Sequence, residues 1–273
     1  MHPPPRLGRR ALLATGGVVA LAGCGQDGSV APLGTSTLRY GEDPSQFAEL
    51  TLPDGTPRGV VVVIHGGFWK AEYDLSLGRP LAQSLVGQGW AACNLEYRRV
   101  GPAEGGGGGT PETFDDVAAG IDRLAGVDGL DTSVVITLGH SAGGHLAVWA
   151  AGRGDAGVRV TGVIAQVGVL DLVRADEQGL GGGAVRSLLG HAPGPDDAAY
   201  DPFRQLPLEV PVRCVHGTDD AVVPIDQSRA YVDAATAAGS DATLTEVAGD
   251  HFVVIDPDSD AWATTLGMLD GLA

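Results

Sequence analysis

Basic residues are scarce in this chain of 273 residues, in which 17 lysines and arginines face 34 aspartates and glutamates. The formal net charge is −17. Such a surface repels nucleic acid and anionic lipid headgroups. The composition therefore excludes a nucleic-acid partner and a membrane contact made through the surface charge of the fold.

Cysteine is also scarce, with three residues in the whole chain, and the Cys and His residues show no metal-ligand spacing. No glycine-rich phosphate loop follows an expected strand. The sequence therefore predicts no metal and no cofactor. Cys93 and Cys214 fall inside expected strands, where two thiols pair only if their Cα atoms lie close together. We expect both to be buried, free and structural.

The apolar run near the N-terminus is short. It extends from Ala11 to Ala22, too few residues to cross a bilayer as a helix. Three arginines precede it and Cys24 follows it, which together are typical of a secretory signal over residues 1–23. The residues after it, up to 36, are small and polar and are expected to form a tether.

Two short motifs in this leader resemble known export signals. The Arg-Arg pair at 9–10 resembles a twin-arginine signal, and Leu-Ala-Gly-Cys, ending at Cys24, resembles a bacterial lipobox. The resemblance implies that Cys24 is lipidated and anchors the protein on the outer face of the cytoplasmic membrane. The alternative is an ordinary secretory signal with a chance cysteine, which would give a secreted protein.

From residue 37 to the end, strand-like and helix-like segments alternate, which predicts an α/β fold with a mostly parallel sheet covered on both faces. Residues 171–209 lack a clear period and contain several glycines and prolines, so they are expected to be a cap insertion. Strands are expected over 38–40, 47–52, 59–65, 91–97, 134–138, 160–167, 211–216 and 242–247, and helices over 75–87, 111–125, 146–151, 226–238 and 261–272.

Ser141 is the candidate nucleophile. It is the central residue of Gly-His-Ser-Ala-Gly, which follows an apolar β-branched run and precedes a helical segment. This order of strand, tight turn and helix is the context that gives the G-x-S-x-G pattern its meaning. We expect Gly139 and Gly143 to flank the turn because a Cβ at either position would collide with a neighbouring strand or helix.

With this elbow in place, the chain from about residue 37 onward resembles the α/β-hydrolase superfamily, whose triad runs Ser, Asp, His along the chain. The segment from His216 to Pro224 resembles the family's H-G-x-x-D-x-x-V-P motif. The resemblance implies that Asp220 is the acid, with Asp219 as the adjacent alternative. His251 follows the last expected strand and is the candidate base.

A fourth motif, HGGFW at residues 65–69, resembles the H-G-G segment of esterases and lipases. The resemblance implies an oxyanion hole formed by the backbone N–H groups of Gly67 or Phe68 and of Ala142. His65 is expected to be structural. Trp69 is assigned either to the substrate pocket or to the core.

HGGFW is similar to the HGGYW of kynurenine formamidases and small carboxylesterases, which also share the Tyr-Arg segment at 97–98. The favoured interpretation is an exported serine hydrolase that cleaves small carboxylic esters through an acyl-enzyme. The alternative is an amide-bond hydrolase of the arylformamidase or prolyl-oligopeptidase type, although the leader would remove the protein from cytosolic formamides. A non-catalytic binding protein on this scaffold is a further alternative, and an intact triad argues against it.

Overall fold

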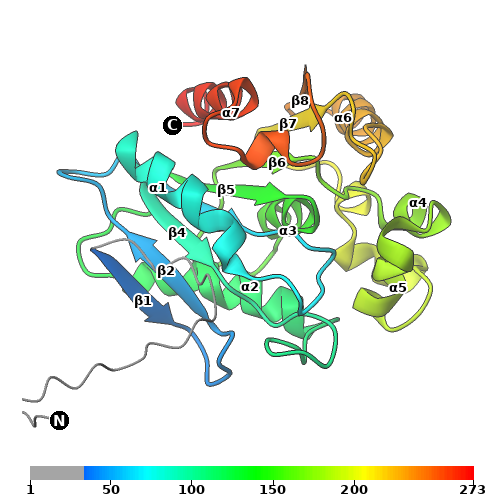
Figure 1. Ribbon diagram of the computed structural model, residues 1–273, viewed down its shortest axis with the longest axis horizontal. Coiled ribbons are helices and arrows are strands. Elements are labelled where there is room, and N and C mark those ends of the chain that lie inside the picture. Colours follow the sequence, from blue (N-terminus) through cyan, green and yellow to red (C-terminus); the bar gives the residue numbers. More distant parts are fainter. Residues whose placement is uncertain (1–33) are drawn as a thin grey trace, which may run out of the picture.

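Eight strands form one sheet in the computed structural model, which describes residues 34–273 (Figure 1). The order is β1-β2-β4-β3-β5-β6-β7-β8; β1 and β2 run antiparallel to their neighbours, and the strands from β4 across to β8 are parallel. The expected signal, Cys24 and most of the tether lie outside the described residues. The strands are β1 Thr35–Arg39, β2 Phe47–Thr51, β3 Val60–Ile64, β4 Ala91–Leu95, β5 Val135–His140, β6 Gly162–Gln166, β7 Val212–Gly217 and β8 Ala242–Val247.

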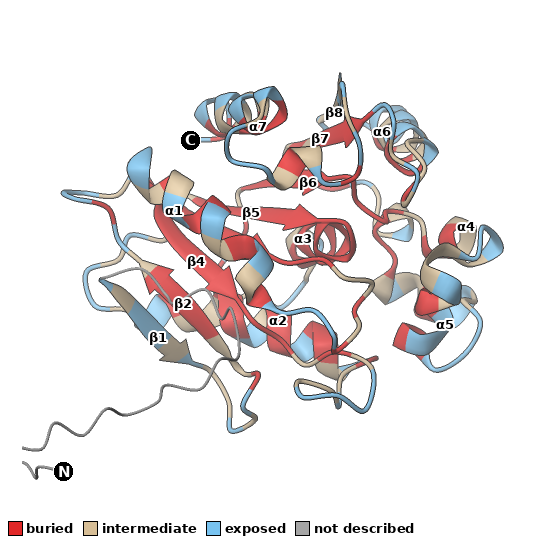
Figure 2. Cartoon of the chain, viewed as in Figure 1, coloured by how far each residue is buried: buried red, intermediate tan, exposed pale blue. Residues whose placement is uncertain are grey.

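Helices cover both faces of this sheet. Helices α1 (Arg79–Gly87) and α7 (Asp260–Asp270) pack on one face, and α2 (Glu112–Asp122), α3 (Ala142–Ala151) and α6 (Asp226–Ala237) pack on the other (Figure 1). Figure 2 shows that the central strands and α3 are buried, while α1, α2, α6 and α7 keep an exposed outer side. This two-sided burial explains why the central strands are continuous apolar runs rather than alternating ones.

The middle of the sheet shows the pattern clearly. Along β3, Val60 and Val62 contribute to the core under α2 and α3, whereas Val61 and Val63 contribute to the core under α1 and α7. Successive side chains of a strand point to opposite faces, so both faces of this strand need apolar residues. The expected α/β-hydrolase fold is confirmed.

Several element boundaries differ from the expected ones. β1 begins at Thr35, three residues before the expected strand over 38–40. The expected helix over 75–87 is divided into a 3₁₀ turn at Leu75–Gly78 and α1. Asp74 caps the turn by accepting from the Ser76 N–H, and Pro80 lies in the first turn of α1, where its missing N–H costs no helical hydrogen bond.

The segment over 171–209 is a helical insertion beside the sheet (Figure 1). It contains α4 (Leu172–Glu177) and α5 (Ala184–Leu189), joined by Gly181, Gly182 and Gly183, all with positive φ. Left-handed backbone at three consecutive positions favours glycine. This explains why the segment shows no helical period over its whole length.

Both described cysteines are free and buried, as expected. Burial raises the pKa of the Cys93 and Cys214 thiols to about 12, so neither forms a reactive thiolate near neutral pH. Within residues 34–273, no helix has the length and apolar character needed to cross a membrane.

Candidate active site

Ser141 lies on a strained turn between β5 and α3. Its backbone has φ 56° and ψ −118°, a conformation that non-glycine residues rarely adopt. The turn is held by a hydrogen bond from the Ser141 N–H to the carbonyl of Gln166 on β6, at 2.8 Å. Backbone strain of this kind persists where surrounding structure enforces it, and it is common at active sites.

The flanking glycines are required by close backbone contacts. A Cβ at Gly143 would lie 2.0 Å from the carbonyl oxygen of Ile64 on β3, and a Cβ at Gly139 would lie 2.0 Å from the carbonyl oxygen of Gly143. Neither contact is possible for a larger residue without moving the backbone. The sterics expected from the sequence are therefore present in the fold.

The structure brings Asp220 and His251 together at the same edge of the sheet. Asp220 follows β7 and His251 follows β8; these strands are parallel neighbours, so their carboxyl ends meet. The Nδ1 of His251 lies 2.6 Å from Oδ2 of Asp220. The Asp220 side chain is fully buried, whereas Asp219 is exposed. Asp220 is thus the residue placed to orient the imidazole.

The carboxylate of Asp220 is stabilised in its charged form. Burial opposes its ionisation, but the nearby His216 ring and hydrogen bonds from His251 and the Val223 N–H outweigh burial and lower its pKa well below the usual range. The Val222 and Val223 N–H groups both donate to Oδ1, at 2.8 and 2.9 Å. Asp220 therefore stays ionised near neutral pH.

Two further histidines, His140 and His216, lie next to Asp220 and His251. His216 Nε2 donates to the Val223 carbonyl at 3.0 Å and lies 3.4 Å from the Asp220 carboxylate. His140 Nε2 donates to the backbone carbonyl of His251 at 2.9 Å, and burial lowers the pKa of His140 to about 3. Neither residue was expected at the site from the sequence, although each lies inside one of the motifs.

Ser141 and His251 line one pocket of about 250 Å³, together with Gly67 and Phe68. Within residues 34–273, no hydrogen bond joins the Ser141 hydroxyl to the His251 ring. Such contacts are often long before substrate binds. The three residues expected to form the triad therefore meet at one site.

The loop after β3 approaches the elbow closely. A Cβ at Gly66 would lie 2.7 Å from the His140 carbonyl oxygen and 3.1 Å from Cβ of Ser141. Gly67 and Phe68 have φ of 107° and 52°. In the described chain, the N–H groups of Gly67, Phe68 and Ala142 donate to no protein acceptor. Donors free beside the elbow are what an oxyanion hole requires.

A buried network holds the start of this loop. His65 Nε2 lies 3.0 Å from Oε1 of Glu96, and the Tyr97 hydroxyl donates to the His65 carbonyl at 2.8 Å. The Arg99 guanidinium donates to the same Glu96 oxygen. Burial lowers the pKa of His65 to about 3, which is consistent with a structural role. The function of Glu96 and Arg99 was not visible from sequence spacing alone.

Trp69 lies in the core, which corrects its assignment to substrate binding. Its side chain has no exposed surface and meets the His145 ring edge-on at 5.1 Å. Positive φ at both Phe68 and Trp69 turns the chain, so that Phe68 lines the pocket and Trp69 packs inward against His145. The sequence could not show which of the two adjacent rings would face the pocket.

The pocket wall is mostly apolar. Within the described chain, no Asp, Glu, Lys or Arg side chain lines it, and no residue of the insertion over 171–209 contributes to it. The insertion supports the wall from behind, since the Lys70 ammonium donates to the Gly181 carbonyl at 2.8 Å beside Phe68. The apolar wall residues are Phe68, Tyr73, Leu77, Val222, Phe252 and Ile255.

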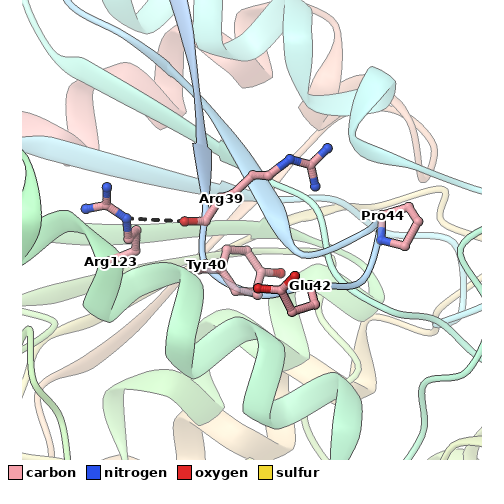
Figure 3. Close-up of a pocket in the computed structure, with 6 residues that line it drawn as sticks. Arg39, Tyr40, Glu42, Pro44 and Arg123 are labelled. Carbon is pink, nitrogen blue, oxygen red and sulfur yellow. Dashed lines mark hydrogen bonds between the residues drawn. The ribbon is translucent and has the colours of Figure 1, made fainter.

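A larger hollow of about 660 Å³ lies at the β1 edge of the sheet (Figure 3). Arg39, Tyr40, Glu42, Pro44 and Arg123 line it, and the Arg123 Nε donates to the Arg39 carbonyl at 3.2 Å. It contains none of the candidate catalytic residues. Over residues 34–273, no cluster of three or more His, Cys, Asp or Glu side chains is arranged to hold a metal ion.

The fold and the elbow define the class, which is the α/β-hydrolases. A family model described as BD-FAE matches residues 50–234, and the chain therefore belongs to the BD-FAE family. This membership agrees with the α/β-hydrolase resemblance found in the sequence.

Two relatives of known name are similar over most of this chain. The isoprenylcysteine alpha-carbonyl methylesterase of Arabidopsis thaliana is 25% identical over 240 residues, covering 78% of this chain and 55% of the plant protein. Esterase LipC of Mycobacterium tuberculosis is 26% identical over 221 residues, covering 71% and 53%. The chain thus spans about half the length of these relatives.

Solved structures share the fold. Esterase 2 of Thermogutta terrifontis, in a form phosphoramylated by tabun, superposes with a TM-score of 0.72 at 23% identity. The match covers 88% of this chain and 93% of that one. At this identity the likeness shows the fold alone, with the central sheet and its helices arranged as in that structure.

Proposed function

We propose that this protein is an exported serine esterase that cleaves small, uncharged carboxylic esters through an acyl-enzyme intermediate. The observation that carries the proposal is the 2.6 Å contact of Asp220 with His251, which lines the same pocket as Ser141 on its strained elbow. The relatives named as esterases support the same reaction class.

In the proposed mechanism, the Ser141 hydroxyl attacks the ester carbonyl carbon while His251 Nε2 takes the hydroxyl proton. Asp220 keeps the Nδ1–H tautomer and stabilises the imidazolium. The carbonyl oxygen becomes an oxyanion, which accepts from the N–H groups of Gly67 or Phe68 and of Ala142.

Collapse of this intermediate expels the alcohol, which receives the proton from His251 and leaves the acyl group on Ser141. Water then attacks the acyl-enzyme, giving up its proton to His251. The acid is released as the proton returns to the serine oxygen.

The pocket favours esters over charged peptides. Its described wall has no charged side chain that could pair with a peptide terminus. An ester alkoxide also departs with less help than an amine, which must be protonated as it leaves. HGGFW resembles the segment of formamidases, so an arylformamide is the substrate against which the ester must be compared.

The test is labelling of the full chain with a fluorophosphonate, followed by mapping of the adduct by mass spectrometry, with Ser141→Ala as the matched control. We expect one adduct, on Ser141, and neither label nor activity in the variant. An adduct on another residue of an active enzyme contradicts the nucleophile assignment. The second measurement is kcat/KM for matched aryl esters, N-formylkynurenine and peptide anilides; a value for the formamide or anilide above every ester overturns the esterase proposal.

We further propose that Cys24 is lipidated and anchors the protein on the outer face of the cytoplasmic membrane. The Leu-Ala-Gly-Cys sequence and the preceding basic and apolar leader support this. Two or more acyl chains give stable anchoring where one does not. Cells expressing the wild type or Cys24→Ser are fractionated; equal amounts of both in the membrane fraction contradict the anchor.

A further inference from the structure

Large apolar side chains that remain exposed are concentrated at the mouth of the active-site pocket. Within residues 34–273, four such side chains are prominent, namely Leu52, Tyr73, Leu77 and Phe252, and all except Leu52 line this pocket. Exposed apolar residues scattered singly need no explanation, but a group around one opening marks a binding surface.

Phe252 is the most exposed of the four, at 58%. Its ring is nevertheless held in a defined place, meeting the His251 ring edge-on at 5.3 Å and the His140 ring at 6.1 Å. The Phe252 N–H donates to the Asp250 carboxylate at 2.9 Å, which fixes the turn. The ring therefore presents a wide apolar surface beside the base without being part of the core.

The proposed reaction indicates which portion of the ester contacts Phe252. In the proposed reaction, the departing alkoxide takes its proton from Nε2 of His251, since Nδ1 is bound to Asp220. The alcohol portion must then pass next to His251. Phe252 follows His251 directly and lines the same pocket, so it lies where that alcohol portion leaves.

We propose that Phe252 is a specificity-determining residue that binds the alcohol portion of the substrate, and that Tyr73 and Leu77 complete an apolar rim around it. The inference rests on the proposed esterase function and adds a substrate class to it. The rim selects esters of apolar aryl or alkyl alcohols over esters whose alcohol has little apolar surface.

The test compares three esters on the full-length protein. Benzyl acetate and methyl acetate share an acyl group and differ in the alcohol; methyl phenylacetate is an isomer of benzyl acetate with the ring on the acyl side. The variants are Phe252→Ala and Phe252→Leu, with Leu52→Ala as the control, because Leu52 is similarly exposed at 51% but does not line the pocket.

We expect the ratio of kcat/KM for benzyl acetate to that for methyl acetate to fall about tenfold in Phe252→Ala, the scale of one lost aromatic contact with its buried area. The fall should be smaller in Phe252→Leu, and Leu52→Ala should leave the ratio unchanged. Because the ratio is taken within one preparation, partial unfolding of a variant does not affect it.

The outcomes separate the two proposals. A wild type that hydrolyses none of the three esters overturns the esterase function itself. An active wild type whose ratio is unchanged in Phe252→Ala overturns the role of Phe252 alone. A loss confined to methyl phenylacetate contradicts the assignment of Phe252 to the alcohol side.

Discussion

Replacing Glu96 by glutamine should destabilise the protein far more than loss of an ordinary surface charge. The Glu96 carboxylate is 5% exposed and interacts with four donors: the His65 ring, the Leu75 and Tyr97 N–H groups and the Arg99 guanidinium. Glutamine keeps the shape but carries one oxygen in place of two, and its amide N–H₂ group faces donors.

The size of the expected loss in stability follows from the buried charge of Arg99. The Arg99 side chain is also 5% exposed, so in Glu96→Gln its charge remains buried without a counter-charge. Breaking a buried pair in this way costs about 3–5 kcal/mol. The matched control is Asp270→Asn, which removes one partner of the exposed pair with Arg58 and should cost about 0–1 kcal/mol.

The network also holds the start of the loop that carries the proposed oxyanion donors, since His65 directly precedes Gly66 and Gly67. A displaced donor should lower kcat about tenfold or more, towards the 10²–10³ measured for complete loss of one donor in other enzymes. Urea unfolding measures the change in stability. The rate on a small ester, corrected for the folded fraction, measures the change in kcat. A loss in the free energy of unfolding of less than about 1 kcal/mol in Glu96→Gln would contradict the buried role of this carboxylate. A corrected kcat equal to that of the wild type would contradict its role in positioning the loop.

Three further outcomes follow from the site and its surroundings. Asp220→Asn should lower kcat by roughly 10⁴, as loss of the acid does in serine proteases, whereas Asp219→Asn should change it little; a larger loss from the second would reverse the assignment. Gly143→Ala should abolish activity, because its Cβ would collide with a backbone carbonyl, whereas Gly87→Ala, at a position with nothing within 4 Å, should stabilise slightly; equal activity in the two variants would argue against the steric account. Burial raises the pKa of Asp201 to about 6, so folding favours its protonated form. Asp201→Asn should therefore raise the free energy of unfolding by about 1–3 kcal/mol above pH 6 and leave it unchanged below pH 4. A gain in stability that does not depend on pH would contradict this.

Several features of the fold and the site were predictable because each depends on a few consecutive residues. The apolar run before Gly139, the turn at Ser141 and the helix after it are local patterns, and the glycine at 143 follows from sterics that any such turn imposes. The order of strands and helices follows in the same way from hydrophobic period and turn residues. The fold class could therefore be predicted from the residues, and the resemblance to the α/β-hydrolase superfamily added Asp220 and His251 as candidates.

Other features depended on residues that meet only after folding. The choice between Phe68 and Trp69 for the pocket was decided by two positive φ angles and by packing against His145, far along the chain. The pocket wall also comes from loops after β3, β7 and β8 rather than from the insertion, as neighbouring parallel strands bring these loops to one edge.

The sequence by itself determined the proposed reaction class, since the resemblance to the α/β-hydrolase order of nucleophile, acid and base rests on residue type and chain order. Only the tertiary structure decided which side chains support them. His140 and His216 contact the loops of His251 and Asp220, and Glu96 contacts His65, through bonds that join different elements. Contacts of this kind depend on the positions of two segments in space, and no local pattern in either segment specifies both.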